Sequence, residues 1–377
     1  MAHDNSIKLI STNPLYDMKS LYTTMMLCAF LIVGLLSSTV QAQIGHDRIP
    51  IHDPVMVEHE GTYYAFATGE GIAVWSSPDM KSWSPEEQVF DSPPEWSLEL
   101  VPDFNNVMWA PDIAEQDGTF YLYYSVSQFG RNNSAIGVVT NETLNPDDPN
   151  FEWTDHGILV QSVPGRDMWN AIDPNLAFDD NGTPWLSFGS FWMGLKIVKL
   201  KDNLTEIVKA PQDREWHTIA ARHRHWKVDE RDAGDAANPE LNYEELYSDD
   251  LLEANRNMEN GAVEAPFIFK KNDYYYLFVS MDRCCRGLES SYKIKVGRSK
   301  DITGPFLDKS GQKMIHGGGT LIAKENEDWA AVGHQAAYTF DGTDYLIFHG
   351  YDKSDEGKAK LIIREIKWEK NWPSITL

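Results

Sequence analysis

The stretch "PIHDPVMVEHEGTYYAFATG", residues 50–69, contains an Asp-Pro pair, an apolar segment, a glycine turn and a second segment rich in tyrosine and phenylalanine. Aspartate is a poor strand former and proline cannot donate to a ladder, so Asp53-Pro54 marks the head of a strand. The apolar segments on either side of Gly61 predict a β-hairpin. A single Asp-Pro pair is typical of a turn, so its meaning depends on whether the stretch recurs.

Four later stretches repeat this layout of head, strand, turn and aromatic strand. They are "WAPDIAEQDGTFYLYYS" (109–125), "AIDPNLAFDDNGTPWLSFGS" (171–190), "VEAPFIFKKNDYYYLFVS" (263–280) and "GHQAAYTFDGTDYLIFHG" (333–350). A third apolar segment follows each hairpin, which makes five units of at least three strands. Repeated antiparallel sheets of this size predict an all-β protein, a five-bladed β-propeller. A β-sandwich is the alternative, but a sandwich does not need a repeated head motif.

The heads of the five units carry the residues of greatest chemical interest. Alignment on the prolines places Asp53 and Asp173 in one slot, with Ala110 in that slot in the second unit. Glu264 lies one residue earlier, and its longer side chain can reach the same space. The fifth head offers His334. Because the inner strands of a propeller line one channel, we expect these heads to meet around a single opening.

Two aspartates and one glutamate in one cavity repel one another, so at least one should have a raised pKa and hold a proton near neutral pH. One protonated and one ionised carboxyl group are what glycoside hydrolysis requires. The alternatives are that these acids coordinate a cation or cap strands. Asp112 follows its proline instead of preceding it, so we expect it to point elsewhere and to bond the neighbouring strand.

Aromatic and small polar residues cluster near the same heads, in "VMWAPD", "SVSQFG", "WNAIDP" and "GSFWMG". Flat apolar rings stack on sugars, while amides and hydroxyls pair with sugar hydroxyl groups. Each aromatic taken alone is more often a core residue. Together with the acids they favour a sugar-binding cleft, and the candidate substrate-binding residues are Trp109, Phe129, Asn170, Ser190, Phe191 and Trp192.

The N-terminal segment, residues 1–42, lies outside the repeat pattern. From residue 18 it reads "MKSLYTTMMLCAFLIVGLLSSTVQAQ", with a lysine, an apolar run over 25–36 and small residues before Ala42. This layout predicts a signal peptide cleaved after Ala42, and a secreted or periplasmic protein. A membrane anchor is the alternative, but the apolar run is short for a span of about 20 residues. The catalytic propeller is then expected over 43–377, without stable membrane insertion.

The formal net charge of −24 opposes nucleic acid and anionic membranes as partners, and we expect a monomer. A charged, non-alternating stretch at about 209–260 predicts an insert of loop or helix beside the active-site mouth. Its residues 223–225, His-Arg-His, lack a third ligand at metal-binding spacing and are expected on a solvated surface. The adjacent Cys284 and Cys285 are expected either to form a vicinal disulfide or to stay reduced.

The motifs "HDP", "WAPDI", "SAIG", "NAIDPNL", "GSFW", "EAPFI", "YYLFVSMDRCCRG" and "YKIKVGRSKDITGPF" resemble the endo-α-1,5-L-arabinanases of glycoside hydrolase family 43, over about 51–349. The resemblance implies a five-bladed propeller and hydrolysis of plant or algal arabinan with inversion. It implies Asp53 as general base, Glu264 as general acid, and Asp173 as the residue that orients the acid and tunes its pKa.

The resemblance also implies a hydrated metal, usually calcium, held by a histidine of the last blade, here His334 in "AVGHQAAY". Calcium prefers oxygen donors, so water would complete its shell. The chain departs from the family pattern at 335–337 and in the acidic insert, which leaves endo versus exo action open. The alternatives are an exo-acting α-L-arabinofuranosidase or β-xylosidase, and a non-catalytic sugar-binding propeller. A fructan-cleaving enzyme is disfavoured because Ile172 stands where that group has arginine.

Overall fold

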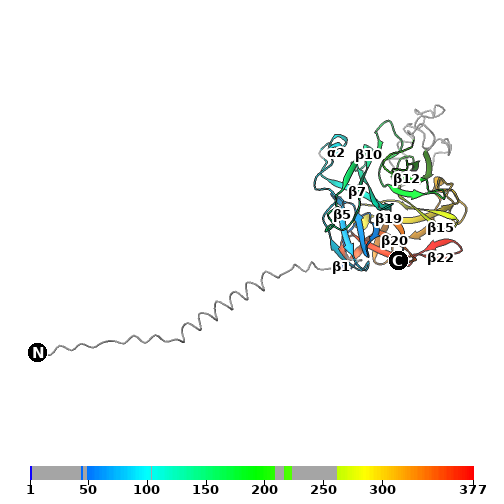
Figure 1. The fold of residues 1–377 in the computed structure, drawn as a ribbon. Helices are drawn as coiled ribbons and strands as arrows, with labels where there is room; N and C mark the ends of the chain where they lie inside the picture. The colour runs from blue at the N-terminus through cyan, green and yellow to red at the C-terminus, as the bar shows by residue number, and fades with distance from the viewer. Residues whose placement is uncertain (2–43, 46–48, 103, 209–215, 223–260) are drawn as a thin grey trace. The chain divides into compact units, whose positions relative to one another are not determined.

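The computed structural model describes residues 1, 44–45, 49–102, 104–208, 216–222 and 261–377 (Figure 1). Five antiparallel sheets of the compact unit Ile44–Leu377 are arranged as a five-bladed propeller, which confirms the predicted fold class. The predicted signal peptide lies outside the described residues. None of the described residues belongs to a helix that is long and apolar enough to cross a bilayer.

The sheets follow one another along the chain, and each is named here as a blade in that order. Blade one has the spatial order β1 (Ile44–Gly45), β6 (Ser82–Pro85), β5 (Ala73–Ser77), β3 (Thr62–Ala67), β2 (Val55–His59). Blade two has the order β10 (Thr154–Ser162), β9 (Ser134–Asn141), β8 (Thr119–Val126), β7 (Val107–Gln116), β4 (Gly69–Glu70). The short helix α2 (Glu95–Leu100) lies between β6 and β7 in the chain.

The remaining blades are four-, four- and three-stranded sheets. Blade three contains β11 (Asn175–Phe178), β12 (Pro184–Phe188), β13 (Leu195–Lys199) and β14 (Trp216–Ala220). Blade four contains β15 (Val263–Lys271), β16 (Tyr274–Met281), β17 (Lys293–Ser299) and β18 (Thr320–Ala323). Blade five contains β19 (Trp329–Phe340), β20 (Thr343–Asp352) and β21 (Lys358–Glu365), and a last hairpin joins β22 (Lys367–Glu369) to β23 (Trp372–Ser374).

The hairpin that opens the repeat forms as predicted. β2 and β3 pair from Val55 with Phe66 to His59 with Thr62, which leaves Glu60 and Gly61 as a two-residue loop. Both loop residues have positive φ, 51° and 79°, as a type I′ turn requires, and the twist of this turn matches that of the strands it joins. The turn thereby fixes which residues of each strand face the neighbouring blades.

The ring of five blades is closed where residues 49–51 pair with β21, far along the chain. The sequence did not predict this pairing. Ile49 accepts a hydrogen bond from the Leu361 amide at 3.2 Å, and the Ile51 amide donates to Ala359 at 3.3 Å. Residues 49–51 therefore add a short antiparallel segment to the edge of β21. Ile49 and Ile51 are buried there, so blade five gains both a partner for its edge and apolar contact.

The insert was predicted at about 209–260, but part of this range belongs to a blade. Trp216–Ala220 forms β14, the outer strand of blade three, where Ile197 pairs with His217 and Val198 with Trp216. The charged residues around this strand hid it, because the segment shows no clear alternation of apolar and polar residues. The rest of the predicted insert, with residues 223–225, lies outside the described residues.

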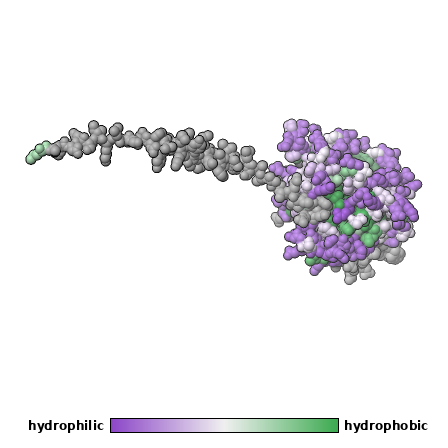
Figure 2. Space-filling model, turned by 90° about the horizontal axis from the view of Figure 1, so that it is seen from below, coloured by the Kyte–Doolittle hydropathy of each residue, from purple (hydrophilic) through white to green (hydrophobic). Residues whose placement is uncertain are grey.

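The propeller exposes a largely hydrophilic surface on the face seen in Figure 2, with apolar residues gathered toward its centre. This surface agrees with the acidic composition of the chain. The apolar residues of the sheets instead pack between blades. Phe66 of blade one, Tyr124 of blade two and Phe278 of blade four, for example, are all at most 1% exposed.

Candidate active site

One residue in each blade adopts the left-handed conformation at the aligned head position. The φ angles are 55° for Asp53, 43° for Ala110, 58° for Asp173, 54° for Ala265 and 53° for His334. Such angles are uncommon for residues other than glycine, so their recurrence identifies one structural position repeated five times. In blades two, four and five this position lies at a shift of strand register and not at the strand end.

This repeated position places the predicted site residues around one pocket of about 710 Å³. The three predicted catalytic carboxylates, Asp53, Asp173 and Glu264, come from blades one, three and four and all line it, as does His334 from blade five. The predicted substrate-binding residues also line this pocket: Trp109, Phe129, Asn170, Ser190, Phe191 and Trp192. The sequence repeat therefore brings together side chains that are far apart in the chain.

Asp53 is a buried carboxylate surrounded by donors. Its Oδ1 lies 3.0 Å from His334 Nδ1 and 2.8 Å from His52 Nδ1, and its Oδ2 accepts a 2.5 Å hydrogen bond from Thr68. Burial raises the pKa of this carboxyl, but the charges and hydrogen bonds of the two histidines outweigh burial and hold its pKa well below the usual range. Asp53 is therefore ionised at neutral pH.

The histidines around Asp53 differ in charge. Burial lowers the pKa of His334, but Asp53 at 3.0 Å more than compensates and raises it to about 9. His349 is fully buried, and burial followed by the nearby His52 lowers its pKa well below the usual value. Its Nδ1 accepts a hydrogen bond from the Asp53 amide at 3.1 Å, so neutral His349 holds the backbone of the carboxylate.

Asp173 has the opposite protonation from Asp53. Burial is the main cause of a raised pKa, His334 opposes it, and the negative charges of Glu264 and Asp53 add to it, so that the pKa is about 8. Its Oδ2 accepts a hydrogen bond from the Ala265 amide at 3.1 Å, next to Glu264 in the chain. Asp173 therefore fixes the backbone that carries Glu264, and it keeps a proton at neutral pH.

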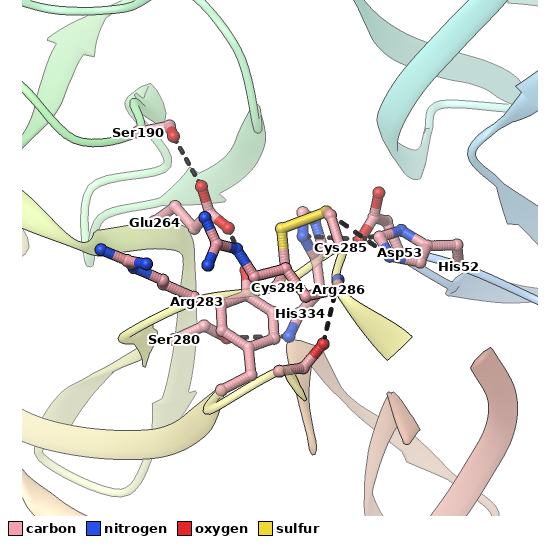
Figure 3. Close-up of a disulfide and its surroundings, with 12 residues drawn as sticks. His52, Asp53, Ser190, Glu264, Ser280, Arg283, Cys284, Cys285, Arg286 and His334 are labelled. Atoms are coloured by element: carbon pink, nitrogen blue, oxygen red, sulfur yellow. Dashed lines mark hydrogen bonds and ion pairs between the residues drawn. A yellow bond between two sulfur atoms is a disulfide. The ribbon is translucent and has the colours of Figure 1, made fainter. Parts of the chain in front are cut away.

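Glu264 is buried and held by two hydroxyl groups. Its Oε2 accepts a 2.6 Å hydrogen bond from Ser190 (Figure 3), and its Oε1 accepts one from Tyr292 at 2.5 Å. Ser190 is also bridged to Glu264 through the backbone. Ser190, predicted as a substrate-binding residue, thus has its hydroxyl engaged with a carboxylate. The two bonds fix the direction in which the Glu264 carboxyl group points into the pocket.

The aromatic residues of the pocket come from three different segments. Phe129 follows β8 and is 72% exposed, while Phe191 and Trp192 lie in a tight loop after β12 with φ angles of 56° and 41°. Exposed or strained aromatic side chains add little to a core, so their place in the pocket wall suits a sugar-stacking surface. Asn170 accepts a hydrogen bond from Ser134 at 2.6 Å through its Oδ1.

Asp112 lies away from this pocket, as expected from its place after a proline. Its Oδ2 accepts a hydrogen bond from the Leu176 amide at 2.7 Å, so the carboxyl group of blade two bonds the first strand of blade three. Burial raises its pKa to about 7, against the lowering effect of the hydrogen bonds from Leu176 and Asn175. Asp112 is thus a connection between blades.

Several residues of the site were not singled out by the sequence. They are His52 and His349 beside Asp53, Tyr292 on Glu264, Tyr351, whose hydroxyl contacts His52 Nε2 at 2.9 Å, and Gln335, which donates to Ala265 at 2.8 Å. His52 stands directly before Asp53 in the repeated head, which was the available signal. Gln335 follows His334 in the head of the fifth unit. His349, Tyr351 and Tyr292 face the site from second strands or later segments, where no local pattern marks their contacts.

Cys284 and Cys285 are joined by a disulfide, which settles the alternative that the sequence left open. Both residues line the pocket, together with Arg283 and Arg286. The disulfide lies in the segment between β16 and β17, near His52 (Figure 3).

Comparison with known proteins gives a consistent result. A profile described as Glycosyl hydrolases family 43 matches residues 48–373. The extracellular exo-α-(1→5)-L-arabinofuranosidase of Cellvibrio japonicus is 45% identical over 332 residues, 88% of this chain and 88% of that protein. The extracellular endo-α-(1→5)-L-arabinanase 1 of Bacillus subtilis is 37% identical over 328 residues, 86% of this chain and 87% of that protein.

A solved structure agrees with these relatives. The α-L-arabinanase of Cellvibrio cellulosa complexed with arabinohexaose is 44% identical, covers 87% of this chain and 96% of that one, and superposes with a TM-score of 0.75. The residues matched by the family profile, 48–373, include Asp53, Asp173 and Glu264. This chain belongs to family 43 of the glycosyl hydrolases.

Proposed function

We propose that this chain is an exported hydrolase that cleaves α-1,5-linked L-arabinan with inversion at the anomeric carbon. The observation that carries the proposal is one pocket in which Asp53 is ionised while Asp173 is protonated beside Glu264. Both relatives described above are named for α-(1→5)-L-arabinan chemistry and as extracellular. Export further rests on the signal-like segment before residue 43.

In the proposed mechanism Asp53 is the general base. Its ionised carboxylate removes a proton from a water molecule that attacks the anomeric carbon. Glu264, held by Ser190 and Tyr292, gives a proton to the leaving oxygen on the other face of the sugar. Inverting enzymes place the two carboxyl groups about 6.5–9.5 Å apart so that this water fits between base and substrate.

Asp173 has a positioning role in this scheme. Its hydrogen bond from the Ala265 amide fixes the chain next to Glu264, and its proton limits the negative charge around the acid. Trp109, Phe191 and Trp192 line the same pocket and offer apolar faces to furanose rings. A non-catalytic lectin would need these rings but would have no use for the three acids.

The proposal is tested by incubating the purified protein with debranched arabinan and resolving the products by size. Endo action releases a range of oligosaccharides early, whereas exo action releases one short product from the start. The endo mode expected from the sequence is our first candidate. The exo mode is the second, because the relative with 45% identity is named as exo-acting and the one with 37% as endo-acting. Polymer that binds but stays intact would contradict both.

The stereochemistry has a test of its own. Because the base activates water instead of attacking carbon, the first product should have the inverted, β configuration. Proton NMR during the first minutes of turnover resolves the two anomers before they interconvert. Retention would mean that one carboxylate acts as a nucleophile.

We propose separately that calcium binds beside His334, which releases its ring proton on binding, with water supplying most of the ligands. Calcium takes about six to eight oxygens, whereas the nearest cluster of described donors, His52, Asp53 and His349, offers two nitrogens and one carboxylate. Protein side chains in the described part of the chain therefore fit only a hydrated ion. When bound, the ion would supply positive charge near Asp53.

Calcium removal should lower the unfolding temperature of the wild-type protein. A ligand at about 100 times its Kd adds about 2.7 kcal/mol to the free energy of unfolding. Scanning calorimetry with calcium and with a chelator measures this difference, and His334→Ala should abolish it. An unfolding temperature that does not respond to calcium in the wild-type chain contradicts the proposal.

A further inference from the structure

The disulfide between Cys284 and Cys285 lies in the wall of the pocket and contacts the residues around Asp53. Cys285 is exposed, and its Sγ lies 3.9 Å from His52 Nε2 (Figure 3). No step of the mechanism proposed above uses either sulfur. The question is what a covalent bond between neighbouring residues contributes at this place.

The bridge closes a small ring around a single peptide bond, so it restricts the backbone of both cysteines. Cys285 has a φ angle of 66°, in the left-handed region that residues with a side chain rarely adopt. The flanking loop is also fixed, because the Ser291 amide donates to Arg283 at 2.9 Å and the Arg286 amide to Ser290 Oγ at 3.1 Å. The ring thus holds the Cys285 amide in one direction.

That amide donates a hydrogen bond to the Tyr351 hydroxyl at 2.7 Å. A tyrosine hydroxyl that accepts from an amide keeps its own proton for another acceptor, and His52 Nε2 lies 2.9 Å away. If Nε2 accepts, a ring proton of His52 is on Nδ1, which faces Asp53 Oδ1 at 2.8 Å. A chain of contacts therefore runs from Cys285 through Tyr351 and His52 to Asp53.

The His52 ring is also held from its face. It stacks on the buried His349 ring with centroids 4.0 Å apart, and His349 in turn accepts from the Asp53 amide. The stack fixes the plane of His52, while Tyr351 fixes its rotation and its tautomer. The disulfide acts at the start of this chain of contacts. It fixes the Cys285 amide, and that amide donates the hydrogen bond that holds the Tyr351 hydroxyl.

We propose that the Cys284–Cys285 disulfide is a positioning element of the active site, which holds Tyr351 and thereby sets the tautomer and orientation of His52 against Asp53. This inference rests on the proposed role of Asp53 as general base. It makes catalysis sensitive to thiol reductants. A dithiol that opens the bridge transfers two electrons and two protons, yielding two cysteine thiols and its own cyclic disulfide.

The activity test compares the oxidised and the reduced wild-type protein, with free thiols counted, on an aryl α-L-arabinofuranoside. Reduction should lower kcat about tenfold while KM changes less than about twofold, because the base loses its alignment and the sugar contacts remain. A Cys284→Ser, Cys285→Ser double variant should match the reduced protein and be indifferent to reductant. Unchanged kcat in the reduced, folded protein overturns the proposal.

Tyr351→Phe tests whether reduction acts through the contacts from Cys285 to Tyr351 and His52 or through a general loosening of the loop. This variant should lose about as much kcat as the reduced wild-type, and reduction should cost it nothing more, because both changes break one chain of contacts. Tyr63→Phe, near the hairpin turn of blade one and outside the pocket lining, is the matched control and should respond to reductant like the wild-type. If reduction lowers the kcat of Tyr351→Phe by as much as it lowers that of the wild-type, the effect does not pass through Tyr351 and the proposal is overturned.

A measurement without substrate keeps this inference distinct from the proposed function. Ring ¹⁵N chemical shifts, assigned with a His52→Asn variant, should show His52 protonated on Nδ1 in the oxidised protein, and reduction should shift this tautomer balance. Identical His52 spectra in both redox states overturn the proposal. Failure of the oxidised protein to cleave arabinan would instead contradict the proposed function alone, since the spectra do not depend on turnover.

Discussion

Asp53 and Glu264 carry the same functional group but have different neighbours. Asp53 is surrounded by two imidazole nitrogens and the Thr68 hydroxyl, whereas Glu264 is bonded to the hydroxyls of Ser190 and Tyr292. Nearby positive charge favours an ionised base at Asp53. The two hydroxyl groups at Glu264 fix the direction of its carboxyl group, which the proposed proton donor needs in order to reach the leaving oxygen.

Asp53→Asn and Glu264→Gln should each lower kcat on arabinan by roughly 10²–10⁴-fold, because each removes one half of the acid–base pair. An aryl arabinoside with a good leaving group needs little help from the acid, so Glu264→Gln should retain much more activity on it than Asp53→Asn. Steady-state kinetics on both substrates measures the contrast.

The matched control is Glu99→Gln, an exposed residue of α2, which should leave both activities unchanged. Calorimetry establishes that each variant is folded. Equal losses on arabinan and on the activated arabinoside in Glu264→Gln would show that Glu264 is not the proton donor.

The sequence predicted the meeting of the three carboxylates because their repeat places them in equivalent positions of different blades. It did not predict His52, Tyr292 or Tyr351 as their partners. Side-chain contacts across a propeller depend on how blades are rotated against each other, and that rotation leaves no local period in the chain. A raised pKa was expected for at least one carboxyl of the group, and the structure assigns it to Asp173.

At the scale of elements, neighbouring blades are joined by polar bonds as well as by apolar packing. Asp112 of β7 bonds the Leu176 amide at the start of β11, in a buried environment. A second bond of this kind joins Asn175 Oδ1 to the Ile268 amide of β15 at 2.8 Å. These bonds satisfy backbone amides that the sheets themselves leave unpaired at the blade boundary.

Asp112 should make stability depend on pH. Its pKa is about 7 in the folded chain and about 3.9 in the unfolded chain, so folding takes up a proton between these values. Its contribution to the free energy of unfolding is greatest below about pH 4 and falls by about 1.4 kcal/mol per pH unit until about pH 7. Asp112→Asn keeps an acceptor for Leu176 and should remove this dependence.

Chemical denaturation of wild-type and Asp112→Asn protein from pH 4 to pH 8 measures the difference. The variant should gain stability relative to the wild-type as pH rises, while exposed Asp91→Asn should run parallel to the wild-type. Parallel curves for Asp112→Asn would mean that the buried carboxyl titrates in its ordinary range. The pKa of Asp173 is also raised, so it changes the free energy of unfolding with pH in the same direction. Because Asp173 is present in all three proteins, its effect cancels in the differences between them.

Individual strands were less predictable than the hairpins. The glycine-, asparagine- and aspartate-containing turns and the aromatic strands gave the inner part of each blade. The outer strand β14 was missed because its neighbours are charged and its own five residues are too few to show a period. Outer strands face solvent on one side and carry little of the apolar signal on which such predictions depend.

At the scale of the whole molecule, the propeller is closed by residues 49–51 against β21. The five sheets were predictable from the repeats, but this closure was not. The segment Ile49-Pro50-Ile51 is short, contains a proline and pairs with a strand at the other end of the chain. Closure of this kind makes the stability of blade five depend on the N-terminal edge of the propeller.

A chain that begins at His52 should therefore be less stable than one that begins at residue 43. Burial of Ile49 and Ile51 contributes about 1.5–3 kcal/mol for each side chain, reduced by the entropy of ordering the segment, so we expect a loss of about 3 kcal/mol. Guanidinium unfolding of the two proteins measures it. Equal free energies of unfolding would show that this segment does not stabilise the ring.

The left-handed residue in each blade has a consequence for how this protein can be altered. Ala110 and Ala265 adopt the same backbone angle as Asp53, Asp173 and His334, although a methyl group brings no chemistry to the centre. The left-handed conformation at this position is therefore a property of the repeated fold and does not depend on which side chain the position carries. Scaffold and reactive groups are separable, and a redesign that installs a new acid, base or nucleophile at residue 110 would start from a backbone already shaped to present it.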